Sequence, residues 1–206
     1  NVAQFNTIDD ATSSAVVLAG GVSDTAAAYA ATNGTTTSGT AAIKIQDPNA
    51  VMTVSDAANV AQFNTIDDAT SSAVVLSGGL TDQAVNFAAT NGTATSGLTN
   101  STTQDTNVAI VISGGTAPNV AQLNTIGAAT AGTVTASITG TAADLDGLTT
   151  ASTDVITATV SNAATVAQFN LIDAATATNV VLSGGLTDEA VNFAATNGTA
   201  TSGLTN

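Results

Sequence analysis

Carboxylates are the only side chains here whose number and spacing suggest chemistry. Fourteen aspartates and one glutamate face a single cation, Lys44, and the chain has neither histidine nor cysteine. Two aspartate pairs stand where a helix is expected to end, and a third pair flanks Leu145; the six residues are Asp9, Asp10, Asp67, Asp68, Asp144 and Asp146. Carboxylate and carbonyl oxygens are the ligands that Ca²⁺ prefers. These residues are therefore candidate calcium ligands, with solvated helix ends and turn caps as the alternative interpretation.

Two sequence details weaken a general calcium role. The later copy of the aspartate pair reads Asp173-Ala174, so one carboxylate is lost there. The segment from Asp144 to Gly147 matches the start of a helix–loop–helix calcium loop but lacks its later ligands. We therefore expect no obligatory cofactor, with calcium as the one candidate ion.

The missing residue types exclude several function classes. Without histidine and cysteine, the chain cannot form the usual zinc sites, a histidine-based catalytic triad or a disulfide. A single lysine cannot neutralise a phosphate backbone, so nucleic acid is not an expected partner. No run of 18 apolar residues occurs, and membrane insertion is not expected. We expect a protein that is not an enzyme.

Internal repetition dominates the chain. Residues 59–100 recur at 165–206 with 35 of 42 positions identical, and residues 1–20 match 59–78 at 19 of 20 positions. Such fidelity indicates a fixed structural unit laid end to end. We expect one repeat array over residues 1–206, cut from a longer chain. Its units, called copies 1 to 4 below, span roughly 1–58, 59–118, 119–164 and 165–206.

Each copy opens with a segment of helical spacing. In copy 2, Val60, Phe63 and Ile66 lie three residues apart, which places them on one face of a short helix. The residues at the Phe63 position are expected to be buried against a sheet; they are Phe5, Phe63, Leu123 and Phe169. An asparagine follows each of them, and we expect these four amides to be buried and bonded to backbone groups; they are Asn6, Asn64, Asn124 and Asn170.

The remainder of each copy predicts short strands alternating with helices. After residues 60–69, we expect a strand at 73–76, then a helix capped by Thr81 and ended by Asn91-Gly92, and over 93–107 the least regular structure of the chain. Further strands are expected at 108–112, 133–138, 155–160 and 180–182, and helices at 119–126, 142–148 and 165–172.

The spacing of these elements predicts the fold class. Strands that start at residues 133, 155 and 180 leave room for one short helix and two turns between them. We predict an α/β tandem-repeat solenoid of short strand–helix units, with a parallel sheet on one face. An antiparallel sandwich of adhesin type and an all-β helix remain as alternatives.

Three phrases resemble a known class of repeats. VAQFNTIDDAT, AVVLSGG and VTASITGTAADLDGL are similar in style to the low-complexity tandem repeats of giant bacterial surface proteins of the cyanobacterial type. The resemblance covers nearly the whole chain and implies a secreted S-layer, adhesin or filament component, often stabilised by calcium. The chain lacks the GGxGxDxUx nonapeptide of calcium-binding β-helices, which departs from that pattern.

The expected function is therefore structural. We expect a segment of an extracellular or cell-surface filament, surface layer or stalk, which associates with neighbouring repeats or with copies of itself. The alternative is an adhesin-type binding module that recognises glycans or cell surfaces. A fibre assembled end to end would favour the first function, and a shallow pocket holding an ordered sugar would favour the second.

Overall fold

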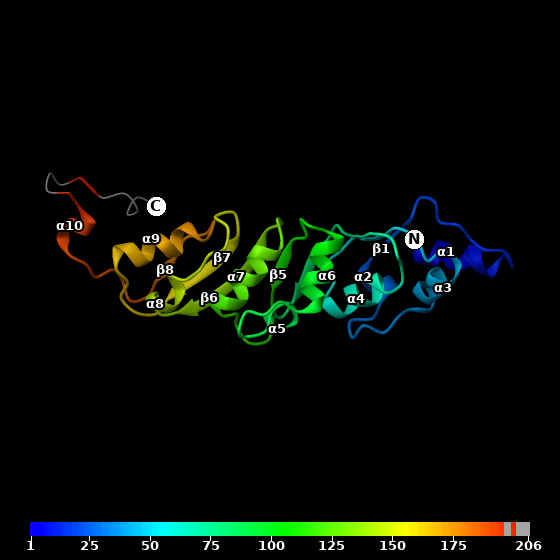
Figure 1. Cartoon of the computed structure of the whole chain (residues 1–206), viewed down its shortest axis with the longest axis horizontal. Coiled ribbons are helices and arrows are strands. Elements are labelled where there is room, and N and C mark those ends of the chain that lie inside the picture. The colour runs from blue at the N-terminus through cyan, green and yellow to red at the C-terminus, as the bar shows by residue number, and fades with distance from the viewer. Residues whose placement is uncertain (196–198, 201–206) are drawn as a thin grey trace. The chain divides into compact units, whose positions relative to one another are not determined.

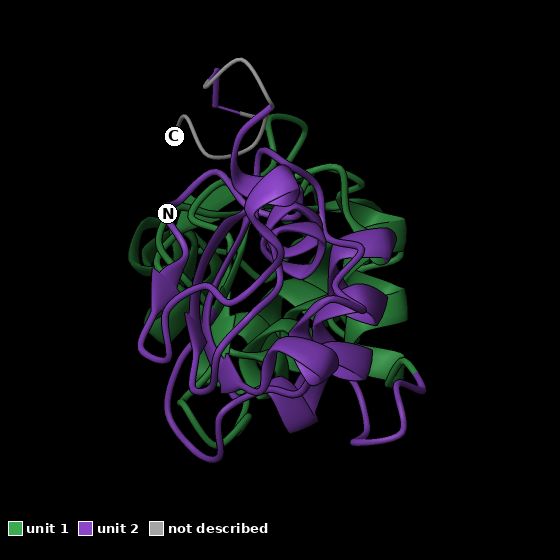
Figure 2. Ribbon diagram, turned by 90° about the vertical axis from the view of Figure 1, so that its left-hand side faces the viewer, with its two compact units in different colours: residues 1–82, 94–111, 129–132 green, residues 83–93, 112–128, 133–206 purple. Residues whose placement is uncertain are grey.

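The computed structural model describes residues 1–195 and 199–200 (Figure 1). Contacts divide the chain into two compact units, coloured separately in Figure 2. Unit 1 comprises residues 1–82, 94–111 and 129–132, and unit 2 comprises residues 83–93, 112–128 and 133–206. Over the described residues, ten helices accompany eight strands arranged in parallel sheets of three and five strands. The α/β class is confirmed, and the sandwich and all-β alternatives are wrong.

Unit 1 is built around three parallel strands in chain order. Its helices are α1 (Val2–Asp10), α2 (Ala26–Tyr29), α3 (Ser38–Gln46), α4 (Val60–Asp67) and α6 (Ser96–Gln104). Its strands are β1 (Val22–Asp24), β2 (Met52–Val54), β3 (Val74–Leu76), β4 (Leu80–Asp82) and most of β5 (Ile110–Ile112). Met52 pairs with Val22 on one side and with Val74 on the other. One chain passage with its helices therefore separates each strand from its parallel neighbour; we call such a passage a coil.

Unit 2 repeats this arrangement, and its strands β6 and β7 are longer than those of unit 1. Its elements are α5 (Ala84–Phe87), α7 (Val120–Ala129), β6 (Val134–Gly140), α8 (Ala142–Leu145), β7 (Val155–Val160), α9 (Val166–Ala174), β8 (Val181–Leu182) and α10 (Ala190–Phe193). Strand β7 lies between β6 and β8, pairing Thr135 with Val155 and Thr159 with Val181. The expected strands at 133–138, 155–160 and 180–182 are thus confirmed, with β6 extending two residues further.

The helices that open the four copies, α1, α4, α7 and α9, each place a large apolar side chain in the core. Phe5, Phe63, Leu123 and Phe169 are 2%, 0%, 0% and 8% exposed, which confirms their expected burial. The starts of α4 and α9 are fixed by capping boxes, in which Gln62 and Gln168 exchange hydrogen bonds with the capping residue. Because each buried side chain of this size contributes about 1.5–3 kcal/mol, this apolar face holds each helix on its sheet.

Two expected element boundaries are wrong. Residues 93–107 contain α6, whose N-cap Thr95 accepts a hydrogen bond from the backbone N–H of Leu98. Burial of Leu98 offsets the poor helix propensity of this polar stretch. Thr81 belongs to β4, so α5 begins after Gln83 and ends at Phe87. Gly92, with a φ of +84°, lies beyond the helix and forms a turn.

The predicted hydrogen bonding of the four asparagine amides to backbone groups is confirmed at one position. The Nδ2 of Asn124 donates to the carbonyl oxygen of Gly147 at 2.9 Å, and its Oδ1 accepts from the backbone N–H of Thr149 at 2.8 Å. All four asparagines are half-buried, so the expected deep burial is wrong. At Asn6 the neighbouring helix presents Gly39, and a Cβ added there would lie 2.9 Å from the Asn6 Oδ1. The amide therefore packs beside a helix backbone.

Candidate functional site

The six candidate calcium ligands lie at separate places. Within the described residues, no group of three or more Asp, Glu, His or Cys side chains is close enough to hold a metal ion. Asp9 and Asp10 end α1, whereas Asp67 ends α4 and Asp68 is its C-cap. Asp144 lies in α8, and Asp146 is the C-cap of that helix. Calcium binding at these residues stays a prediction.

Protein donors engage three of these carboxylates. Gln104 donates its Nε2–H to Asp67 at 2.7 Å, and Gln168 donates in the same way to Asp146 at 3.1 Å. The Thr141 hydroxyl donates to Asp144 at 2.6 Å within a capping box. These contacts match the alternative interpretation, in which the carboxylates tie helix ends to neighbouring segments.

Two of these carboxyl groups have shifted pKa values. Burial raises the pKa of Asp67, the hydrogen bond from Gln104 opposes that rise, and the Asp68 charge adds to it. Hydrogen bonds from the hydroxyl and backbone of Thr141 hold the pKa of Asp144 below its usual value. The negative charge is therefore favoured at the Asp144 cap and disfavoured at the end of α4.

A second set of aspartates anchors helix starts. The first N–H of α1, α4 and α9 donates to an aspartate Oδ2 lying 22 residues later, at 3.0 Å each time. The pairs are Val2 with Asp24, Val60 with Asp82, and Val166 with Asp188. A carboxylate at a helix N-terminus complements the positive end of the helix dipole. The recurring Ser-Asp or Thr-Asp dipeptide was the available sequence signal.

Other aspartates accept hydrogen bonds from backbone N–H groups ahead of β1 and in β6. The backbone N–H of Leu18 donates to Asp47 at 2.7 Å, and that of Val134 donates to Asp154 at 2.8 Å. Asp154 is 2% exposed and also accepts from the backbone N–H of Ala151 at 2.9 Å. Many of the aspartate carboxylates therefore accept hydrogen bonds from backbone groups, and several of these bonds join successive coils.

The most regular contact between coils uses three side chains of the opening helix. In copy 2, Asn59, Gln62 and Thr65 donate to carbonyl oxygens of the preceding loop. The bonds are Asn59 Nδ2 to Thr32 at 2.8 Å, Gln62 Nε2 to Ala30 at 2.9 Å and Thr65 Oγ1 to Gly34 at 2.6 Å. We call this set the loop clasp. Every acceptor is a backbone group, so the clasp recognises the conformation of the loop.

Copy 3 contains the same clasp, within unit 2. The bonds are Asn119 to Thr90 at 2.9 Å, Gln122 to Ala88 at 2.8 Å and Thr125 to Gly92 at 2.5 Å. Glycine is required in both clasped loops: Gly34 and Gly92 have φ values of +81° and +84°. A Cβ added to them would lie 3.1 and 3.2 Å from a helix carbonyl oxygen. The loop therefore fits the helix closely and in one conformation.

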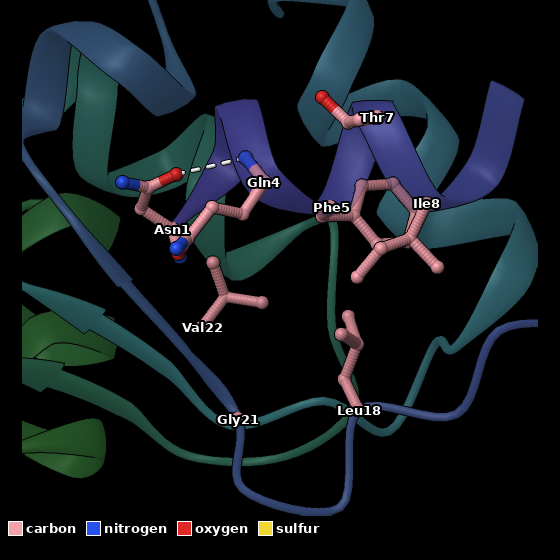
Figure 3. Close-up of a pocket in the computed structure, with 8 residues that line it drawn as sticks. All are labelled: Asn1, Gln4, Phe5, Thr7, Ile8, Leu18, Gly21 and Val22. Carbon is pink, nitrogen blue, oxygen red and sulfur yellow. Dashed lines mark hydrogen bonds between the residues drawn. The ribbon is translucent and has the colours of Figure 1, made fainter. Parts of the chain in front are cut away.

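In copy 1 the equivalent face is open. A groove of about 540 Å³ is lined by Asn1, Gln4, Phe5, Thr7, Ile8, Leu18, Gly21 and Val22. Figure 3 shows Leu18 and Val22 extending toward α1, where Phe5 and Ile8 lie. Ile8 is 53% exposed, whereas Ile66 at the same position of copy 2 is 0% exposed. Three of the residues that line the groove, Asn1, Gln4 and Thr7, occupy the positions of the clasping residues of copies 2 and 3.

The polar side chains of this face have hydrogen-bond donors that are not used in the structure. Gln4 is exposed, whereas its counterparts Gln62 and Gln122 are 5% and 4% exposed. Among the described residues, the Nδ2 of Asn1 and the Nε2 of Gln4 have no hydrogen-bond acceptor, and Thr7 keeps only its bond to the Ala3 carbonyl within the helix. The face therefore presents the three donors of a loop clasp without a loop.

Comparisons with protein families, with curated proteins and with solved structures found no match to this chain. Throughout the described residues, every helix is too short or too polar to cross a membrane.

Proposed function

We propose that this chain is a structural segment of an extracellular filament, surface layer or stalk. Its copies form an α/β solenoid in which each coil is held by the next. The observation that carries this proposal is the loop clasp, which recurs with the same donors and acceptors in copies 2 and 3. An assembly that grows by adding equivalent coils needs such a contact, because each coil must offer the next one the same surface.

The aspartate anchors support the same role. The bonds from Val2, Val60 and Val166 tie three helices to aspartates 22 residues later in the chain, each at 3.0 Å. Side chains that could perform chemistry are thus used to join coils. A net charge of −14 with one lysine favours a well-solvated surface, as suits a protein exposed outside the cell.

Electron microscopy of the purified 206-residue chain tests this proposal. A structural repeat segment should give rods of uniform width, since each coil adds length along one axis and leaves the cross-section unchanged. Round particles of one size would contradict it. An adhesin-type module would instead bind a defined glycan at a saturable site, which a glycan-binding assay on the same sample would detect.

A further inference from the structure

Each clasped loop carries an Asn-Gly sequence at its tip. Asn33-Gly34 is clasped by α4 within unit 1, and Asn91-Gly92 is clasped by α7 within unit 2. A third such sequence, Asn197-Gly198, lies outside the described residues. Both described asparagines are exposed, and the Nδ2 of each has no hydrogen-bond acceptor among the described residues. Because glycine has no Cβ to hinder its nitrogen, an Asn-Gly sequence is well suited to attack by the backbone on the side-chain amide.

The reaction at such a sequence is an intramolecular substitution, here written for the first loop. The backbone nitrogen of Gly34 attacks Cγ of Asn33, so a new C–N bond closes a succinimide ring and the Cγ–Nδ2 bond breaks. The displaced nitrogen takes up the proton of the Gly34 amide and leaves as ammonia. Water then opens the ring at either carbonyl, which leaves aspartate or isoaspartate at this position. Water is the only co-reactant, and the exposed loop admits it.

The local fold polarises one reacting group and withholds the other. The Oδ1 of Asn33 accepts from the backbone N–H of Thr35 at 3.0 Å, and this donor stabilises the negative charge that develops on the oxygen during attack. The attacking nitrogen is engaged elsewhere, because the N–H of Gly34 donates to the Ala31 carbonyl at 2.8 Å. The equivalent bonds of the second loop join Thr93 to Asn91 at 3.0 Å and Gly92 to Ala89 at 2.8 Å.

The clasp holds the carbonyl groups on both sides of the reacting peptide bond. Asn59 donates to the Thr32 carbonyl at 2.8 Å, and Thr65 donates to the Gly34 carbonyl at 2.6 Å. Since the peptide group is planar, the nitrogen of Gly34 can turn toward Cγ only by rotation about neighbouring backbone bonds. That rotation displaces the carbonyls that α4 holds. Attack therefore requires the loop to leave the helix.

We propose that Asn33 and Asn91 are sites of spontaneous deamidation and that the loop clasp sets the rate at each site. A clasped loop is protected, and an opened loop reacts. The bond from Thr35 to the Asn33 amide lies within the loop and does not depend on the helix, so the amide stays polarised when the clasp opens. Isoaspartate adds a methylene group to the backbone of a loop that fits its helix in one conformation, and it prevents the clasp from closing again.

Two full-length variants, each with one weakened clasp, test the proposal. Gln62→Ala removes a buried bond to the first loop and Gln122→Ala removes one to the second, so each variant retains the other loop as an internal control. Thr70→Ala is the matched control, because its hydroxyl donates to the buried Ala50 carbonyl at 2.6 Å outside the clasp. Thr65→Val, a smaller change to the first clasp, replaces Gln62→Ala if circular dichroism shows that variant to be unfolded.

Each folded chain is incubated in mildly alkaline buffer, and peptide mass spectrometry follows the conversion of each amide into an acid. Peptides that reach Gln83 separate Asn91 from Asn197, since the second stretch has Glu189 at that place. The wild-type chain in urea provides the rate for an opened loop.

In Gln62→Ala, Asn33 should deamidate about 5- to 30-fold faster than in the wild type, because loss of a buried hydrogen-bond partner shifts an opening equilibrium by about that factor. Asn91 should keep its wild-type rate in that variant, and Gln122→Ala should give the reverse result. Both sites in Thr70→Ala should match the folded wild type, and both should react faster in urea.

Three outcomes would overturn the inference. An unchanged rate at Asn33 when its clasp is weakened would show that the clasp does not control the reaction. An equal acceleration in Thr70→Ala would assign the effect to a general loss of stability. A folded wild-type chain whose two asparagines react as fast as they do in urea would show that the clasp gives no protection.

Discussion

The Nε2 of Gln62 donates a hydrogen bond of 2.9 Å to the carbonyl oxygen of Ala30, and both residues are buried. The Oε1 of the same amide accepts from the backbone N–H of Asn59 at 3.1 Å. One side chain thus satisfies a backbone group on its own coil and another on the preceding coil. Gln122 makes the same two contacts in copy 3, with Asn119 and Ala88.

Replacing Gln62 by alanine should lower the free energy of unfolding by about 1–3 kcal/mol, because it leaves the buried Ala30 carbonyl without this partner. Gln4→Ala is the matched control at the same position of copy 1, where the amide is exposed. It should change stability by less than about 0.5 kcal/mol. Urea denaturation of both variants measures the difference, and equal effects would show that the clasp contributes nothing to stability.

The single tyrosine provides a spectroscopic probe of the interface between β1 and β2. The Tyr29 hydroxyl donates to the carbonyl oxygens of Val22 at 2.7 Å and Thr53 at 3.3 Å. Burial raises the pKa of Tyr29 well above its usual value, and the nearby Asp24 charge raises it further. Absorbance at the tyrosinate band should therefore stay flat through the usual pKa of about 10 and rise only when the chain unfolds.

A tyrosinate signal near pH 10 in a chain that retains its circular dichroism would contradict this burial. Tyr29→Phe offers a second measurement. It removes the hydroxyl while keeping the ring, as Phe87 does at the same position of copy 2. The expected loss is about 1 kcal/mol of unfolding free energy, the ordinary net contribution of a hydrogen bond.

Asp67→Asn should stabilise the protein at neutral pH and not at acid pH. The pKa of Asp67 is raised in the folded state, so folding favours its neutral form. Its contribution to stability is therefore present below the unfolded pKa of about 3.9 and is lost as pH rises through the folded value. Asparagine has no charge to desolvate and retains an oxygen that can accept from Gln104.

The expected gain for Asp67→Asn at pH 7 is below about 1 kcal/mol, because the group is partly exposed and solvent screens its charge. Denaturation at pH 7 and at about pH 3.5 measures how the difference between variant and wild type changes across the titration. Asp9→Asn removes the same charge at the equivalent position of copy 1 and controls for net charge. A gain that is equal at both pH values would rule out the titration of Asp67 as its cause.

Asp82→Ala should destabilise the protein by about 1–3 kcal/mol, since the first N–H of α4 loses a charged acceptor at 3.0 Å. Asp68→Ala is the control: this exposed aspartate lies at the opposite end of α4, and its removal should change stability by less than about 0.5 kcal/mol. Hydrogen exchange of the Val60 amide localises the effect. An unchanged exchange rate there in Asp82→Ala would contradict the anchoring role.

The elements that could be predicted from sequence are those with strong local patterns. The three-residue spacing of Val60, Phe63 and Ile66 was enough to place α4 and its counterparts, and the alternation in residues 155–160 was enough to place β7. Helix α6 was missed because its sequence is mostly Ser, Thr and Asn, and its support comes from the buried Leu98. Burial of that kind depends on neighbouring coils and leaves little local signal.

The binding surfaces were harder to predict than the fold. Clasp acceptors are backbone carbonyls, such as that of Ala30, and no residue type marks them. The anchoring bond from Val60 to Asp82 spans 22 residues, a distance that is meaningful only once the coil length is known. The Thr81-Asp82 pattern indicates an aspartate at a helix start, but the sequence does not show that this helix is α4, which lies earlier in the chain.

Duplication of copy 2 tests the solenoid account most directly. A second set of residues 59–118 inserted after residue 118 adds two coils, one that carries β3 and β4 and one that carries β5. With parallel strands spaced about 4.8 Å apart, the account predicts a particle about 10 Å longer with an unchanged cross-section. Small-angle X-ray scattering of the original and enlarged chains, each measured as monomer, gives both quantities. An enlarged chain with a wider cross-section and no added length would contradict the account.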